Sequence, residues 1–202
     1  MLFRSEVASL VYEGHPTPFQ RQLRVVEILF APPALPFDTF DAEQYEFLVL
    51  RNLGPEPLDL AGAAFTSGID LILPSSPATA LAAGQSLYVV RNPAAFAARY
   101  GRLPNVAGPW AGALDNAGER LRLIDPAGEE VLDFFYDNQW QPAADGRGRS
   151  LVVVQDGAMP EGWGNPQLWD ASPLALGSPA GLDTDGDGSP NADESQAGTD
   201  PN

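Results

Sequence analysis

The C-terminal segment carries the residue types and spacing of a calcium-binding loop. Asp183, Asp185 and Asp187 stand at loop positions 1, 3 and 5, Gly188 stands at position 6, and Glu194 stands at position 12. This spacing matches the pattern D-x-[DN]-x-[DN]-G-x5-E. Calcium takes about six to eight oxygen ligands at about 2.3–2.6 Å, and carboxylates at alternate positions point inward when the chain curls around the ion. The pattern therefore predicts a Ca²⁺ site.

Further residues of the loop complete the predicted coordination shell. Ser189 offers its backbone carbonyl, Asn191 binds directly or through a water, and Glu194 closes the shell with both carboxylate oxygens. A solvated acidic tail is the simpler alternative, but such a tail has no reason to keep this register. The predicted Ca²⁺ ligands are Asp183, Asp185, Asp187, Ser189, Asn191 and Glu194.

The approach to the loop argues against a helix–loop–helix calcium sensor. Residues 174–181 contain two glycines and one proline, which oppose an entering helix. Pro190 has no N–H group, so a short strand pairing with a partner loop would lose a donor there. We therefore expect a structural calcium unit, with no paired helix to move on binding.

The same segment resembles the thrombospondin type 3 repeats found on bacterial secreted proteins. The resemblance rests on DTDGDG at 183–188, DE at 193–194 and GTDPN at 198–202. In that family such units repeat in tandem, and GTDPN usually leads into another DTDGDG. The resemblance therefore implies that the chain is a piece of a longer protein, with a truncated repeat at 178–202.

Composition limits the classes of function that remain. The 202 residues have 44% hydrophobic content, 20 Gly and 20 Pro, which suits a turn-rich all-β chain of one ordinary domain with appendages. The net charge is −16; residues 183–202 hold six acidic and no basic side chains, which leaves −10 on the remainder. Such a surface repels phosphate backbones and disfavours nucleic acid. With no cysteine, disulfides, thiolate metal sites and cysteine nucleophiles are excluded.

The N-terminal region and the apolar runs bear on membrane targeting. No apolar run reaches the roughly 18 residues needed to span a bilayer. The first residues lack a basic region followed by an apolar stretch, so no signal peptide is predicted. We expect residues 1–20 to hold a strand from a preceding domain and a linker.

The elements that must position any site are mostly short strands. One short helix is predicted over 94–100, because Asn92 can cap it, Pro93 suits its first position and Gly101 can end it. The alternating segment 119–125 and the apolar segment that follows it predict a hairpin. Strands at short, regular spacing favour two packed sheets. The predicted strands are 24–30, 45–52, 58–60, 69–73, 85–91, 119–125, 131–136 and 150–155.

The order of these motifs resembles the lamin-tail domain of bacterial secreted proteins, an immunoglobulin-like β-sandwich, over residues 23–177. The family often has Trp where Ala63 follows Gly62 here. The resemblance implies an all-β sandwich at 21–177, followed by the calcium segment. It is carried by Val26–Ile28, Glu43–Leu48, Asn52–Gly54, Leu58–Gly62, Leu81–Arg91, Asn116–Leu121, Val131–Tyr136, Asp145–Gly146, Ser150–Leu151 and Trp169.

Catalytic constellations are weak in this sequence. His15 is the only histidine, and it lies in a Gly/Pro segment with nothing to orient it for a catalytic triad or a zinc site. Glu43 and Glu46 are candidates for a glycosidase pair, but we expect them to lie on a solvated face or to pair with arginine. The four tryptophans lie outside the predicted strands, where they either stack on carbohydrate or close the ends of the sandwich. They are Trp110, Trp140, Trp163 and Trp169.

The lamin-tail resemblance implies a non-catalytic accessory module that adheres to or positions something outside the cell. The expected location is extracellular or on the cell surface. The expected partners are calcium, a cell-surface protein or polysaccharide, and adjoining domains of the same polypeptide. The alternative is a carbohydrate-binding module of a secreted hydrolase, using Trp110 or Trp140.

Calorimetry tests the calcium prediction. Titration of Ca²⁺ into the chain is expected to release or absorb heat, and Asp185→Ala with Asp187→Ala is expected to remove that heat, because two of the three alternating carboxylates are lost. No heat with the parent chain would end the proposal for this segment.

Overall fold

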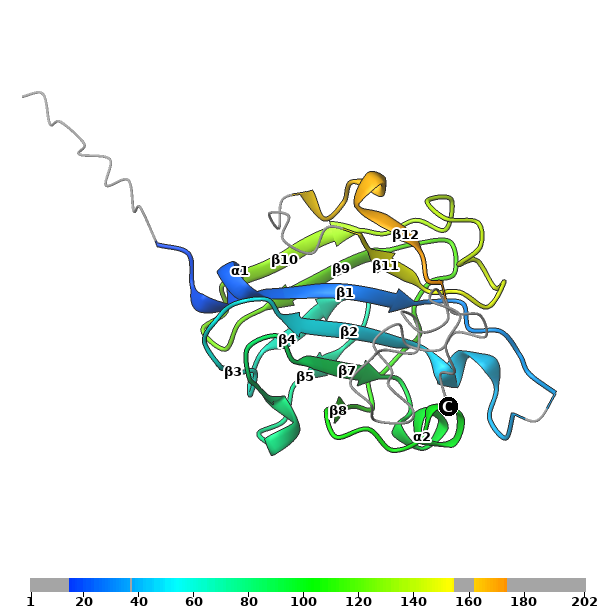
Figure 1. The fold of residues 1–202 in the computed structure, drawn as a ribbon, viewed down its shortest axis with the longest axis horizontal. Coiled ribbons are helices and arrows are strands. Elements are labelled where there is room, and N and C mark those ends of the chain that lie inside the picture. Colours follow the sequence, from blue (N-terminus) through cyan, green and yellow to red (C-terminus); the bar gives the residue numbers. More distant parts are fainter. Residues whose placement is uncertain (1–14, 37, 155–161, 174–202) are drawn as a thin grey trace, which may run out of the picture.

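The computed structural model describes residues 15–36, 38–154 and 162–173. Most of the regular structure in this part of the chain is β-strand, which confirms the mostly-β prediction (Figure 1). Within the described ranges, the larger sheet has six strands in the order β12-β11-β1-β2-β7-β8, and only β7 and β8 pair in parallel. Its strands are β1 (Leu23–Leu29), β2 (Phe47–Asn52), β7 (Ser86–Val90), β8 (Val106–Ala107), β11 (Leu151–Val153) and β12 (Trp169–Ala171).

A second, antiparallel sheet packs against the first. Its order is β10-β9-β4-β5, and β9 with β10 forms the predicted hairpin. A small two-stranded ladder joins β3 to β6. The bounds are β3 (Leu58–Asp59), β4 (Ala64–Ser67), β5 (Leu71–Ile72), β6 (Ala80–Leu81), β9 (Arg120–Ile124) and β10 (Glu130–Phe135).

One hydrophobic core joins the two large sheets. Leu48 and Leu50 of β2 belong to the same buried cluster as Phe65 of β4 and Leu121 of β9. All four side chains are almost completely buried. Because alternate residues of a strand face opposite sides, each strand gives one set of apolar side chains to this shared core.

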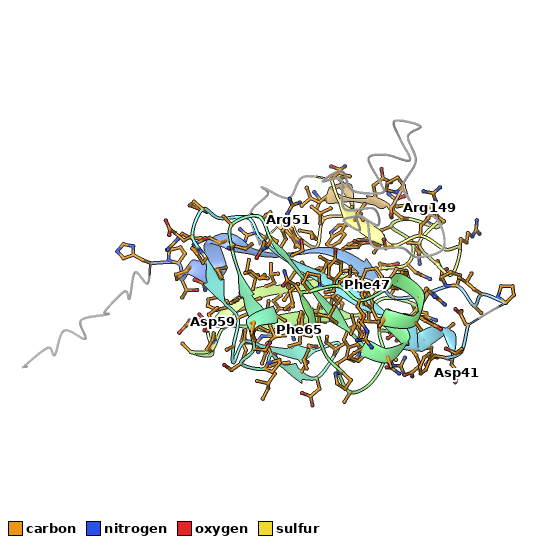
Figure 2. The ribbon with its side chains drawn as sticks, turned by 60° about the horizontal axis from the view of Figure 1, so that its bottom comes forward. Asp41, Phe47, Arg51, Asp59, Phe65 and Arg149 are labelled. Carbon is orange, nitrogen blue, oxygen red and sulfur yellow. The ribbon has the colours of Figure 1, made fainter. Side chains whose placement is uncertain are left out.

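The larger sheet is also covered on its other face. Helix α2 (Pro93–Tyr100) lays Phe96 and Tyr100 against Phe47 and Tyr88. The β2 sequence Phe-Leu-Val-Leu is therefore apolar at successive positions because both faces of the strand are buried. Figure 2 shows Phe47 and Phe65 within the molecule and Asp41 and Asp59 at its periphery.

Two bulges let strands break the two-residue period and still fill the core. In β1 the register shifts between Val25 and Glu27, so Val25 and Ile28 both face the shared core although they are three residues apart. In β10 a similar shift between Glu130 and Leu132 accompanies burial of Val131 beside Leu132. An extra residue in one strand re-aims the following side chains in this way.

The predicted helix is present, and a second α-helix was not predicted. Asn92 caps α2 by accepting the N–H groups of Ala94 and Ala95 at 2.9 and 3.2 Å. Helix α1 (Pro18–Gln22) is held by a capping box between Thr17 and Gln20. The expectation of one short helix was therefore wrong. The predicted domain boundary after residue 20 falls inside α1.

Other elements also differ from prediction. Strands β4, β6, β8 and β12 lie outside the strands predicted from the sequence, and Trp169 is the first residue of β12. Short 3-10 helices also occur in the described ranges, among them η1 (Ala42–Tyr45), η2 (Pro77–Thr79) and η4 (Pro166–Leu168). No helix in these ranges is long and apolar enough to cross a membrane.

Substitution of Leu48 tests the shared core. Leu48 has 0% exposure between the two sheets, and Leu48→Ala is expected to lower the free energy of unfolding by about 2–5 kcal/mol through lost burial and a residual cavity. Ile72→Ala is the matched control, because Ile72 is 69% exposed at a sheet edge and its loss is expected to change stability by less than about 0.5 kcal/mol. Urea denaturation measures both; equal effects would contradict the assignment of the core.

Candidate functional site

The predicted calcium ligands lie outside the residues that the structure describes. The Ca²⁺ site therefore stays a prediction from the sequence. Across residues 15–36, 38–154 and 162–173, no group of three or more His, Asp or Glu side chains is placed to hold a metal ion. The ligands concerned are Asp183, Asp185, Asp187, Ser189, Asn191 and Glu194.

Glu46 is the most strongly perturbed carboxyl group of the described domain. It lies directly before β2, and its side chain is fully buried. One carboxylate oxygen accepts the backbone N–H of Leu114 at 2.9 Å, and the other lies 3.1 Å from Nη1 of Arg91. Burial raises the pKa of Glu46 to about 7, and the Leu114 N–H and the Arg91 charge offset only part of this rise.

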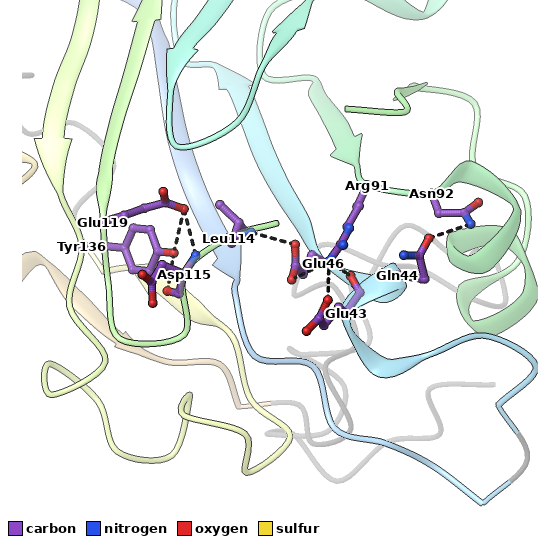
Figure 3. A network of polar contacts seen from close by, with 9 residues as sticks. All are labelled: Glu43, Gln44, Glu46, Arg91, Asn92, Leu114, Asp115, Glu119 and Tyr136. Atoms are coloured by element: carbon purple, nitrogen blue, oxygen red, sulfur yellow. Dashed lines mark hydrogen bonds and ion pairs between the residues drawn. The ribbon is translucent and has the colours of Figure 1, made fainter. Parts of the chain in front are cut away.

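Arg91 brings together the two carboxylates that the sequence offered as a glycosidase pair. Its Nη1 lies 3.1 Å from Oε2 of Glu43 as well as 3.1 Å from Oε1 of Glu46 (Figure 3). Nη1 also donates to the backbone carbonyl of Glu43 at 3.2 Å. The expectation that these glutamates pair with arginine is confirmed. With no exposed surface, Glu46 has no contact with solvent through which a substrate could reach it.

A second set of polar contacts, between Asp115, Glu119 and Tyr136, lies next to the Glu46 contacts, in the loop before β9. The hydroxyl of Tyr136 donates to the carbonyl of Asp115 at 2.8 Å and lies 3.3 Å from the carboxylate of Glu119. The same carboxylate accepts the N–H of Asp115 at 2.9 Å. Burial raises the pKa of Glu119 and also the pKa of Tyr136. These contacts hold the loop against the end of β10 (Figure 3).

Three of the four tryptophans close the core. Trp163 and Trp169 are 0% and 2% exposed, and the Trp163 indole N–H donates to the carbonyl of Val25 at 2.6 Å. Trp110 is 5% exposed, so the structure corrects its proposed role as a stacking surface for sugars. Trp140 alone among the four is only partly buried.

Trp140 borders an open depression of about 450 Å³. Phe135, at the end of β10, lies on the same depression with 64% of its surface exposed. The sequence singled out Trp140 but missed Phe135. The available signal was the pair Phe134-Phe135 in one strand, because only one of two successive strand residues can face the core. The lining consists of Ala117, Gly118, Phe135, Tyr136, Asp137, Trp140 and Gly164.

The remaining sequence candidates do not converge on this depression. His15 is exposed before α1 and is not among the residues that line the depression. Glu43 and Glu46 belong to the Arg91 group instead. Within residues 15–36, 38–154 and 162–173, the depression at Trp140 combines accessible aromatic surface with polar groups.

Comparison with protein-family models, with curated proteins and with solved structures finds no match for this chain. A proposal for the function therefore rests on the geometry of the described residues and on the resemblances in the sequence.

Substitution of Glu46 tests its titration. Its pKa is about 7 in the folded protein against 4.5 for an ordinary glutamate, so the folded state binds a proton that the unfolded chain has lost. Glu46 therefore contributes its full stabilisation below pH 4.5, and this contribution is lost as the pH rises through about 7. Relative to Glu46→Gln, the parent is expected to lose up to about 1.4 kcal/mol of unfolding free energy per pH unit over that window. Urea denaturation at stepped pH measures the difference.

Asp133→Asn is the matched control for this pH series. The hydrogen bond from Arg120 lowers the pKa of Asp133, so its contribution is present above the ordinary value of 3.8 and is lost only as the pH falls below it. Its difference from the parent is therefore expected to stay level over the Glu46 window. A level difference for Glu46→Gln as well would show that Glu46 does not titrate there.

Proposed function

We propose that this chain is a non-catalytic binding module of a larger secreted or cell-surface protein, with a calcium-ordered acidic spacer after it. The module adheres to a surface or positions its neighbouring domains there. Its fold is inferred to be an immunoglobulin-like β-sandwich of the lamin-tail kind. Calcium is the proposed bound ion, and a cell-surface protein or polysaccharide is the proposed partner.

The sheet arrangement supports the fold assignment. The two larger sheets share one hydrophobic core, and most of their neighbouring strands are antiparallel. Several residues that carry the lamin-tail resemblance fall on strands: Val26–Ile28 on β1, Phe47–Leu48 on β2 and Val131–Phe135 on β10. Two packed antiparallel sheets are the usual basis of immunoglobulin-like domains.

The single observation that carries the non-catalytic proposal is the shared pairing of Glu43 and Glu46 with Arg91. Acid–base hydrolysis of a glycosidic bond needs two carboxyl groups that face a bound substrate. Here both glutamates contact one guanidinium group, and Glu46 has no exposed surface. The raised pKa of Glu46 is therefore assigned to the burial of a structural ion pair, and such groups also shift pKa values outside catalytic sites.

The spacer proposal rests on charge. Residues 183–202 hold six acidic and no basic side chains, so they repel one another when the ion is absent. An ion that binds only the folded arrangement of the loop stabilises that arrangement by mass action. Calcium would thereby convert a self-repelling segment into a defined connection to an adjoining domain.

Surface retention tests the proposed function. The fluorescently labelled full chain is incubated with insoluble bacterial cell walls, plant cell walls and immobilised extracellular-matrix protein. We expect it to sediment with at least one of these surfaces while a broad panel of hydrolase substrates stays intact. The Asp185→Ala, Asp187→Ala variant is expected to sediment equally, because the binding surface belongs to the β-domain. A chain that remains in every supernatant, or that turns over a substrate, contradicts the proposal.

A further inference from the structure

The depression at Trp140 has two accessible aromatic walls. Trp140 is partly buried, and Phe135 is 64% exposed. Aromatic rings of this size give large contact areas, and their faces carry partial negative charge. An aromatic pair that borders a concave site is therefore suited to a ligand with an apolar face whose C–H groups carry partial positive charge.

Buried aromatic rings and a tight turn hold Trp140 in place. Its ring centroid lies 6.1 Å from that of Trp169, which in turn stacks on Phe134 at 5.8 Å. Its backbone N–H donates to the carbonyl of Asp137 at 3.2 Å, and Oδ1 of Asp137 accepts the N–H of Gln139 at 2.8 Å. A ring fixed before binding loses little conformational entropy when the ligand arrives.

Two glycines shape the lining of the depression. A Cβ atom at Gly118 would lie 2.4 Å from the carbonyl oxygen of Tyr136, so only glycine lets this loop approach β10 so closely. Gly164 is exposed, and a Cβ there would meet only Phe134, at 3.9 Å. The volume of about 450 Å³ falls within the range of about 300–1,000 Å³ that is typical of small-molecule sites.

The carboxylate of Asp137 on the lining favours a ligand whose hydroxyl groups donate hydrogen bonds. Asp137 borders the depression and, as a carboxylate with about four lone-pair sites, retains acceptor capacity beyond its bond to Gln139. The net charge of −16 disfavours anionic ligands. A ligand with hydroxyl groups at its rim, an apolar ring face and no negative charge fits all of these constraints.

From these observations we infer that the depression bounded by Trp140, Phe135 and Asp137 binds a sugar ring of a neutral polysaccharide. The ring stacks on Trp140, and its hydroxyl groups donate to Asp137. This inference rests on the proposed function as a binding module and names the chemistry of its partner.

Affinity electrophoresis of the full chain in gels containing a neutral β-glucan, α-glucan, mannan or xylan tests this inference. At least one polysaccharide is expected to retard the chain and to shift the tryptophan fluorescence. Trp140→Ala is expected to weaken binding by roughly tenfold, the scale of one aromatic contact. Gly164→Leu is expected to weaken it similarly by filling the depression, without a clash against the core. Ile72→Ala removes an apolar side chain that is exposed like Phe135 but lies on β5, at the sheet edge opposite β10, and this variant is expected to bind like the parent.

Thermal unfolding of each variant separates lost binding from lost folding. The inference is overturned if no polysaccharide retards the parent chain, or if retardation persists in both Trp140→Ala and Gly164→Leu. If either of these results is found but the chain still sediments with a surface in the retention assay, the proposed binding function is kept and only the sugar site is rejected. If it sediments with none, the proposed function fails too. If sedimentation velocity shows that Trp140→Ala abolishes self-association instead, the depression is an interface between copies of the chain.

Discussion

The buried carboxylate of Glu46 is the contact on which one end of the domain depends. It lies at the start of β2 in the larger sheet, and it accepts the N–H of Leu114 in the loop that leads to β9 of the second sheet. Without this acceptor the Leu114 N–H would be buried and unpaired, at a cost of about 1–3 kcal/mol. Arg91 completes the arrangement from the end of β7. Both sheets are thereby joined to one carboxyl group.

Beyond Leu114 the same loop passes to the Asp115, Glu119 and Tyr136 contacts and then to the depression at Trp140. Tyr136 fixes the loop against β10 through its hydroxyl, and Gly118 allows the close approach. The loop thus supplies part of the depression lining while its other end is held by Glu46. Two hydrogen bonds, a buried one to Glu46 and a part-buried one from Tyr136, restrain the loop, which explains how a surface loop can offer a fixed wall.

Elements with strong local signals were predictable from the sequence. The Asn92-Pro93 start and Gly101 end define α2, and the β9–β10 hairpin follows from alternation around a turn. Strands β6 and β8 have two residues each, so their only support is pairing with distant strands, and no local pattern reveals that. The pairing of Glu46 with arginine was foreseen, but its bond to Leu114, 68 residues away, was not.

The depression could be predicted only in part for the same reason. A tryptophan outside the predicted strands is recognisable as a candidate, yet its surroundings come from three separate stretches of chain: Ala117–Gly118, Phe135–Trp140 and Gly164. Ala117, Gly118 and Gly164 help to form the depression only because the aromatic residues Phe135 and Trp140 lie on the same lining. Whether an aromatic side chain closes a core or borders a site is therefore decided by packing. Trp169 and Trp140 illustrate this, since their rings lie 6.1 Å apart while one is buried within the core and the other remains in reach of a ligand.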